Sequence, residues 1–125
     1  MEICFEGIGQ VAATFRTENE KLAAGMAVTL TGDGEVGLGG EGKPLCGVTM
    51  GAARGGAAAV QIGGVVKVGY ADGETFHVGC AALACDGEGK VTADGENGVS
   101  CLVLAVDEAE NEEEDENKKS IVIKL

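Results

Sequence analysis

Short apolar stretches alternate with turns rich in glycine and aspartate along most of the chain. In residues 26–31 the larger side chains alternate with alanine and threonine, which is typical of a strand that buries one face. Gly-Asp-Gly at residues 32–34 then predicts a turn, and the same succession continues further along the chain. The strands that it predicts cover residues 11–15, 26–31, 35–38, 45–53, 57–62, 65–70, 78–85, 90–93, 99–106 and 120–125.

This succession of short strands predicts an all-β protein, a small antiparallel β-barrel or sandwich. Residues 18–24 (ENEKLAA) form the only helix-like stretch and would make at most two turns, so little helix is expected. The chain of 125 residues is long enough for one domain that buries roughly two thirds of its unfolded surface. Its core is expected to consist of small side chains, because tryptophan is absent and the aromatic residues are three phenylalanines and one tyrosine.

The sequence also repeats itself. Residues 25–36 (GMAVTLTGDGEV) are similar to residues 79–91 (GCAALACDGEGKV). Further along, each copy closes on a β-branched run, which is VQI at 60–62 in the first copy and IVI at 121–123 in the second. A repeat of this size predicts two similar β units that bury their apolar faces together. We therefore expect an N-terminal arm and first strand over residues 1–17 and a single β domain over residues 18–125, with the repeat at about 25–70 and 79–125.

The net charge of −12 is unevenly distributed along the chain. Residues 107–119 (DEAENEEEDENKK) contain eight acids and two lysines, and we interpret them as a solvated loop insertion. A calcium site is the alternative, but the run lacks the D-x-D-x-D-G spacing of a calcium loop. Binding to nucleic acid is not expected, because no basic patch would neutralise phosphates. Binding within a membrane is not expected either, because no apolar run approaches the length of a span.

The chain has five cysteines, an odd number, without a C-x-x-C pair. Cys46 and Cys101 occupy equivalent places in the two copies, and we expect both to be small buried hydrophobes in a reducing compartment. The alternative is a metal site formed by His77, Cys80 and Cys85. Their H-x2-C-x4-C spacing is not a standard zinc pattern, and Cys80 and Cys85 would point to opposite faces of one strand. We therefore expect no metal and no cofactor.

No pattern in the sequence predicts catalysis. Residues 37–42 (GLGGEG) resemble a dinucleotide-binding fingerprint only as text, because no helix pattern follows the glycines. A nucleophilic pair of His77 with Cys80 or Cys85 is conceivable, but a single histidine in a β protein is more often structural. Most carboxylates lie in turns or in the acidic run, where water keeps their pKa values ordinary. We expect no enzymatic activity and no catalytic residue.

The order of the motifs resembles the small decoration, or capsid-stabilising, proteins of tailed bacteriophages. Members of that family show a G-D-x-V strand start, a P-x-G-V-A strand, a turn of small residues and a V-x-x-x-G-V-V-x-V strand. Their counterparts here are GMAV at 25–28, PLCGVTM at 44–50, RGG at 54–56 and VQIGGVVKV at 60–68. Met26 stands where the family commonly has aspartate. The size and the glycine-rich β composition are also similar in type to the head protein D of lambdoid phages.

The resemblance, which covers about residues 23–125, implies a non-enzymatic cement protein of a phage or prophage head. Its partner would be the major capsid protein, and a homotrimer at three-fold junctions of the lattice is favoured. It would assemble in the bacterial cytoplasm and then lie on the outer surface of the virion head. The acidic run would face solvent and keep a dense protein layer soluble.

The N-terminal arm is the expected adhesive part, because it has no counterpart before the second copy. Its candidate partner-binding residues could add a strand to an edge of the capsid protein, or could instead cover the protein's own barrel. Another structural component of the virion, or a β-rich interaction module of a bacterium, is the alternative to a decoration protein, followed by a barrel that binds a small ligand. The candidate residues are Ile3, Phe5, Ile8 and Phe15.

Overall fold

The computed structural model describes residues 9–71, 73–108 and 119–125, and every regular element in these ranges is a strand. This confirms the predicted all-β fold. Most strands agree with the predicted ranges to within one or two residues. The strands are β1 Val11–Arg16, β2 Ala27–Gly32, β3 Glu35–Gly37, β4 Lys43–Pro44, β5 Gly47–Thr49, β6 Ala57–Gly63, β7 Val65–Gly69, β8 Gly79–Cys85, β9 Val91–Ala93, β10 Val99–Glu108 and β11 Lys119–Lys124.

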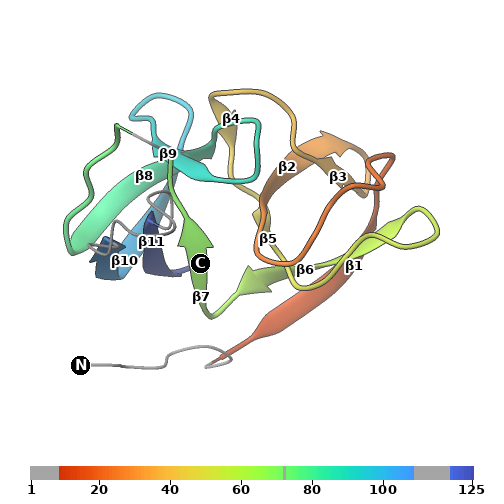
Figure 1. Ribbon diagram of the computed structural model, residues 1–125, viewed down its shortest axis with the longest axis horizontal. Helices are drawn as coiled ribbons and strands as arrows, with labels where there is room; N and C mark the ends of the chain where they lie inside the picture. Colours follow the sequence, from red (N-terminus) through yellow and green to blue (C-terminus); the bar gives the residue numbers. More distant parts are fainter. Residues whose placement is uncertain (1–8, 72, 109–118) are drawn as a thin grey trace, which may run out of the picture.

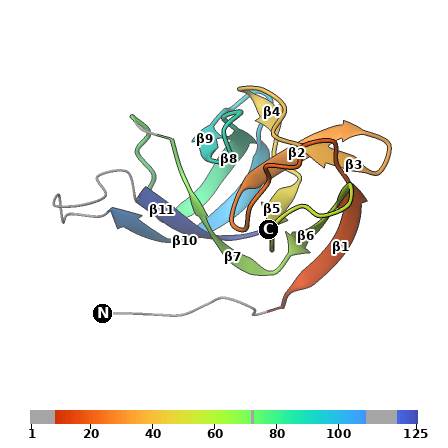
Figure 2. The same cartoon turned by 45° about the vertical axis from the view of Figure 1, so that its right-hand side comes forward.

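The strands form two lobes that lie side by side (Figure 1). The first is a closed barrel with the order β1-β3-β2-β5-β6, which we call the barrel lobe. The second is a six-stranded sheet with the order β4-β8-β10-β11-β7, in which β9 also pairs with β8, and we call it the sheet lobe. β6 leads directly into β7 through Gly64, so the chain passes from one lobe to the other at this point (Figures 1 and 2).

The pairing of strands follows the same order in both lobes. In the barrel lobe β2 pairs with β3 and β5, and β5 pairs with β6, all antiparallel. In the sheet lobe β8 pairs in the same way with β9 and β10, and β10 pairs with β11. β1 joins β6 antiparallel and meets β3 in parallel at Arg16 and Glu35. β7 likewise joins β11, and Tyr70 after it forms a parallel bridge with Val91 of β9.

This pairing places β7 in the sheet lobe, in the position that β1 has in the barrel lobe. The sequence repeat had assigned residues 65–70 to the end of the first copy instead. The strand at 45–53 is also shorter than predicted, since β5 contains only Gly47–Thr49. Between the strands predicted at 35–38 and 45–53, β4 pairs with β8 at the edge of the sheet, a location that tolerates its proline.

Residues 18–24 contain turns in place of the helix-like stretch expected from the sequence. The hydroxyl of Thr17 accepts a hydrogen bond from the backbone N–H of Asn19 at 3.1 Å. The side-chain oxygen of Asn19 accepts one from the N–H of Lys21 at 2.8 Å. Such local bonds between side chain and backbone compete with helical hydrogen bonds, which explains the irregular path.

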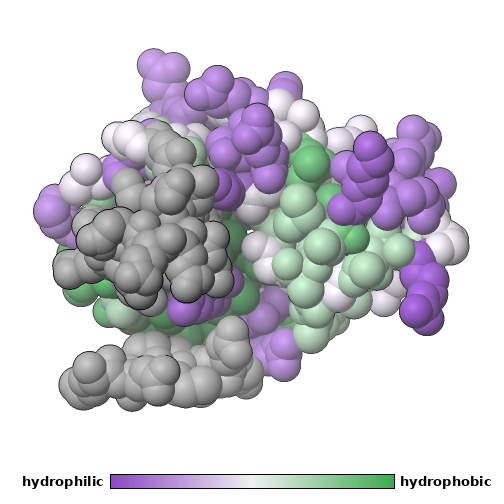
Figure 3. Space-filling view, viewed as in Figure 1, coloured by the Kyte–Doolittle hydropathy of each residue, from purple (hydrophilic) through white to green (hydrophobic). Residues whose placement is uncertain are grey.

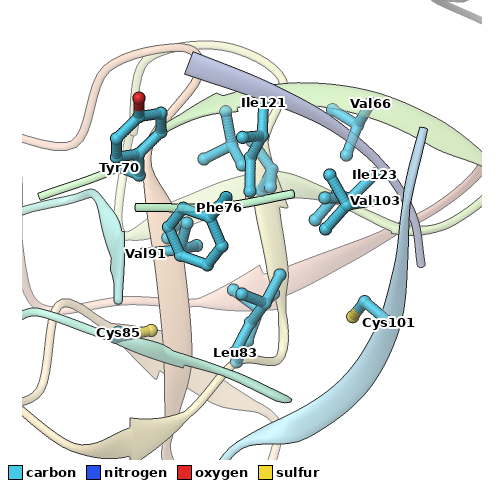
Figure 4. Close-up of a cluster of buried hydrophobic side chains, with 14 residues drawn as sticks. Val66, Tyr70, Phe76, Leu83, Cys85, Val91, Cys101, Val103, Ile121 and Ile123 are labelled. Carbon is cyan, nitrogen blue, oxygen red and sulfur yellow. The ribbon is translucent and has the colours of Figure 1, made fainter. Parts of the chain in front are cut away.

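The sheet lobe contains the larger of two hydrophobic clusters (Figure 4). Its aromatic residues Tyr70 and Phe76 pack edge to face with ring centroids 5.1 Å apart, a favoured arrangement of aromatic rings. Ala27, Leu45 and Val48 of the first half of the chain belong to this cluster, so apolar packing joins the two lobes. The barrel lobe has its own cluster of buried residues, which are Leu22, Val28, Val36, Ala58 and Val60.

The turn at residues 86–89 strengthens the contact between the lobes. The carbonyl of Gly89 accepts a hydrogen bond from the N–H of Ala27 at 2.8 Å. The side chain of Met26 packs so closely on Gly89 that a Cβ there would lie 2.8 Å from its Cε. Asp86 shapes the turn, because its Oδ1 accepts hydrogen bonds from the N–H groups of Glu88 and Lys90. The repeated Asp-Gly turn therefore serves here as a docking element between the lobes.

Candidate interaction surface

The partner-binding residues expected from the sequence fall into two groups. Ile3, Phe5 and Ile8 lie outside the described residues. Phe15 lies on β1, is half-buried and packs against the hydrophobic cluster of the barrel lobe. In the described structure Phe15 thus contributes to the core of the barrel, and a partner-binding role stays a prediction for all four residues.

Strand register places a set of apolar side chains on the outer face of the sheet lobe. Residues directly opposite each other in an antiparallel pair project to the same face. Leu102 of β10 lies opposite Cys80 of β8 and, on its other side, opposite Lys124 of β11. Val122 of β11 lies opposite Ala105 of β10. We use the term outer face for this surface; its polar members are Lys67, Ser100 and Lys124, and its apolar members are Cys80, Ala82, Leu102, Ala105 and Val122.

The neighbouring residues along the same strands point inward. Val103, Ile121 and Ile123 have no exposed surface and belong to the cluster of the sheet lobe. Sequence alternation alone does not show which set is buried, because both sets are apolar in this part of β10 and β11. The pairing of the strands decides it.

The solvated face of an antiparallel sheet is usually polar, whereas the outer face carries exposed apolar side chains. Leu102 is 39% exposed, Cys80 is exposed, and Val78, just before β8, is 70% exposed. Figure 3 shows strongly hydrophobic surface on the left and lower left of the molecule, over the position of β8, β10 and β11. A cluster of this kind on a folded surface is typical of a site for protein–protein contact.

A second group of exposed apolar residues lies on the barrel lobe. Val11 is 53% exposed and Ile62 is 38% exposed, and both lie close to the connection between β6 and β7. Leu30 and Met50 are exposed at other positions of the barrel. These side chains are more scattered than those of the outer face, so we place the candidate interaction surface on the sheet lobe.

The barrel lobe also has a wide depression of about 710 Å³. Three glutamates and one lysine contribute to its lining, and no histidine or cysteine does. Among the residues that the structure describes, no group of three or more histidine, cysteine, aspartate or glutamate residues could hold a metal ion. The depression is lined by Glu18, Asn19, Glu20, Lys21, Thr31, Glu35, Val36 and Gly37.

The structure does not bring His77, Cys80 and Cys85 together into a metal or catalytic site. Cys80 is exposed on the outer face, whereas Cys85, on the same strand, is buried in the core. Burial raises the pKa of the Cys85 thiol to about 12, and the charges of Asp86 and Cys46 add to this effect. Since the thiolate is the reactive and metal-binding form, Cys85 is inert at neutral pH.

The equivalent cysteines of the two copies differ in their surroundings. Cys101 is buried in β10, as the sequence predicts, and burial raises the pKa of its thiol. Cys46 is only half-buried and precedes β5, outside any strand, although burial also raises the pKa of its thiol. Both therefore behave as apolar side chains at neutral pH.

Comparison of the chain with protein-family models, with curated proteins and with solved structures finds no match. Within the residues that the structure describes, no helix is long and apolar enough to cross a membrane. The function must therefore be inferred from the chain's own residues and from their arrangement.

Proposed function

We propose that the protein is a non-enzymatic structural component of a phage or prophage particle, a head-decoration protein that binds the outer capsid lattice and stabilises it. The observation that carries the proposal is the outer face, where Leu102 and Cys80 are exposed, beside the half-buried Val122, on a paired antiparallel sheet. An apolar surface of this kind fits a protein that functions by contact with other proteins. The motif resemblance supports a capsid as the partner.

The physical properties of the chain fit this role. A homotrimer would present three copies of the outer face and three N-terminal arms to several subunits of the major capsid protein. Each contact can then be weak, because the effective concentration of the second and third contacts is high. The net charge of −12 would keep a dense layer of the protein soluble on the particle surface. Assembly in the bacterial cytoplasm agrees with thiols that the structure shows as free.

The alternative function is another structural role in the virion, or a β-rich interaction module of a bacterium. The outer face supports both, since an exposed apolar surface favours contact with a protein but does not identify that protein. The location of the protein distinguishes these functions.

The proposal is tested by inducing any prophage in the organism that carries the gene and banding the released particles on a density gradient. Mass spectrometry of the banded particles is expected to find this protein at a near-stoichiometric ratio to the major capsid protein. Its absence from intact particles, while it is present in the cell, would contradict the decoration role and favour the cellular interaction module. Treating purified particles with added protein then measures attachment directly.

A further inference from the structure

The N-terminal segment begins beside one end of the outer face. Gly9 is the first described residue, and a Cβ built on it would lie 3.7 Å from the Cα of Gly64. Gly64 connects β6 to β7, and its carbonyl also accepts a hydrogen bond from the N–H of Leu125 at 2.8 Å. Residues 1–8 therefore leave the described fold where β7 begins and β11 ends.

A row of paired residues runs across the sheet from this point. Val65 lies opposite Lys124, Lys124 opposite Leu102, and Leu102 opposite Cys80. Three spacings between neighbouring strands add up to about 14 Å. Residue 4 is five residues before Gly9, and five extended residues reach roughly 17 Å. The segment is thus long enough to cross the whole row.

The chemistry of the segment matches that of the outer face. Ile3, Phe5 and Ile8 are apolar, as are Leu102 and Val122 on the sheet. Glu2 and Glu6 carry negative charges, and Lys124 in the row is exposed and positive. Apolar side chains separated by acids would therefore meet a face on which apolar side chains lie beside two lysines, Lys124 and, opposite Val122, Lys67.

We propose that residues 1–8 dock across the outer face of their own sheet lobe while the protein is free, and that they are released from it when the protein attaches to its partner. The docking is independent of the partner, whereas the release rests on the proposed function. In the free protein the apolar side chains of residues 1–8 and the outer face would cover each other. On attachment both would become available to the partner at the same time. The arm and the outer face would then form one interaction device.

The native cysteines allow a direct test in the purified full-length protein. Cys4 lies in the segment and Cys80 at the far end of the row. Oxidation of dilute protein with copper–phenanthroline is expected to give an intrachain disulfide between Cys4 and Cys80, identified by mass spectrometry of the peptides. The matched control is the double variant C80S/S120C. It moves the thiol from β8 to residue 120, which lies at the end of β11 that is far from Lys124 and from Gly9. A docked segment should form the Cys4–Cys80 link about tenfold faster than the control link, because docking raises the effective concentration at one position only.

Equal rates for the two thiols would overturn the docking. A disulfide between two chains, seen as a dimer on a non-reducing gel, would also overturn it and would show exchange of the segment between copies. Release is tested by comparing the cross-linked and the reduced protein for attachment to particles. The cross-linked form is expected to lose most of its attachment, and equal attachment would overturn the release. If neither form attaches while the cross-link forms, the proposed function fails and the docking stands.

Discussion

Leu102 and Cys80 lie directly opposite each other on β10 and β8 and both project from the outer face, whereas the adjacent pair Cys101 and Ala81 faces the core. A shift of one residue in the register of β10 would exchange the two sets. Register therefore determines which apolar side chains of this strand are available to a partner.

Replacing Leu102 with glutamate is expected to weaken attachment to particles without unfolding the protein. The side chain is 39% exposed, and substitutions at such positions usually change the free energy of unfolding by about 0.5 kcal/mol or less. Binding to particles should fall roughly tenfold, which corresponds to a loss of about 1.4 kcal/mol. Urea denaturation measures the stability, and sedimentation of the protein with particles measures the binding.

The matched control for this variant is Val103→Ala, on the adjacent residue. Val103 has no exposed surface, and the removal of its buried methyl groups is expected to cost about 2 kcal/mol of stability. Its folded fraction should still bind normally. Unchanged attachment of Leu102→Glu would show that the outer face is not the contact surface.

Gly47→Ala is expected to destabilise the protein strongly, because β5 passes very close to β6 at this position. A Cβ on Gly47 would lie 2.4 Å from the carbonyl oxygen of Gln61, well inside the contact distance. Overpacking of this kind typically costs about 1–3 kcal/mol. Gly51→Ala is the control, since nothing lies within 4 Å of a Cβ at that position. Thermal unfolding of the two variants should separate them clearly, and equal melting temperatures would contradict the close packing of β5 on β6.

Gln61→Met should destabilise the connection between β6 and β7, where the chain passes from one lobe to the other. The buried side chain of Gln61 donates hydrogen bonds from Nε2 to the carbonyls of Gly63 and Val65, at 2.9 and 3.2 Å. Methionine has a similar length but no donor, so the loss is expected to cost about 1–3 kcal/mol. Hydrogen exchange in β7 should also become faster. The exposed neighbour Ile62 supplies a control variant, Ile62→Thr, and the hypothesis fails if the two variants are equally stable.

Cys85 is expected to lower the stability of the protein at alkaline pH. In the unfolded chain its thiol ionises near the ordinary value of 9.0, whereas in the folded protein burial raises its pKa to about 12. Between these values the unfolded state has lost a proton that the folded state retains, so the free energy of unfolding falls as the pH rises. Below about pH 9 the thiol is protonated in both states, so the ionisation of Cys85 does not reduce the free energy of unfolding there. Urea denaturation of the protein and of Cys85→Ala should show a steeper alkaline decrease for the protein with cysteine.

The same burial predicts the order in which the thiols react. In a background with Cys4→Ser and Cys46→Ser, which also removes the half-buried thiol of Cys46, Cys80 should react rapidly with a thiol reagent, because it is exposed. Cys85 and Cys101 are buried and should react only after unfolding. Cys80→Ser in this background should remove the rapid phase, and a rapid phase that persists would contradict the burial of the remaining thiols.

The strands with long apolar alternation could be predicted from the sequence, because their pattern is local. β4 could not, since it has two residues, one of them proline, and owes its existence to pairing with β8. The outer face could not be predicted from the local sequence pattern either. Residues 101–106 (CLVLAV) are apolar throughout, and only their pairing with β8 and β11 separates the exposed from the buried members. The correspondence of β1 and β7 was hidden as well, because VAATFR and VVKVG share little sequence.

Although strand pairing repeats along the chain, the two lobes are not independent folding units. β4 leaves the barrel half of the chain and pairs with β8, while Ala27, Leu45 and Val48 complete the cluster of the sheet lobe. A fragment that ends at Gly63 would expose these three side chains, and the remaining fragment would lack them. We therefore expect the lobes to unfold in a single cooperative transition, and we expect separately produced halves to acquire their structure only by reassociating with each other.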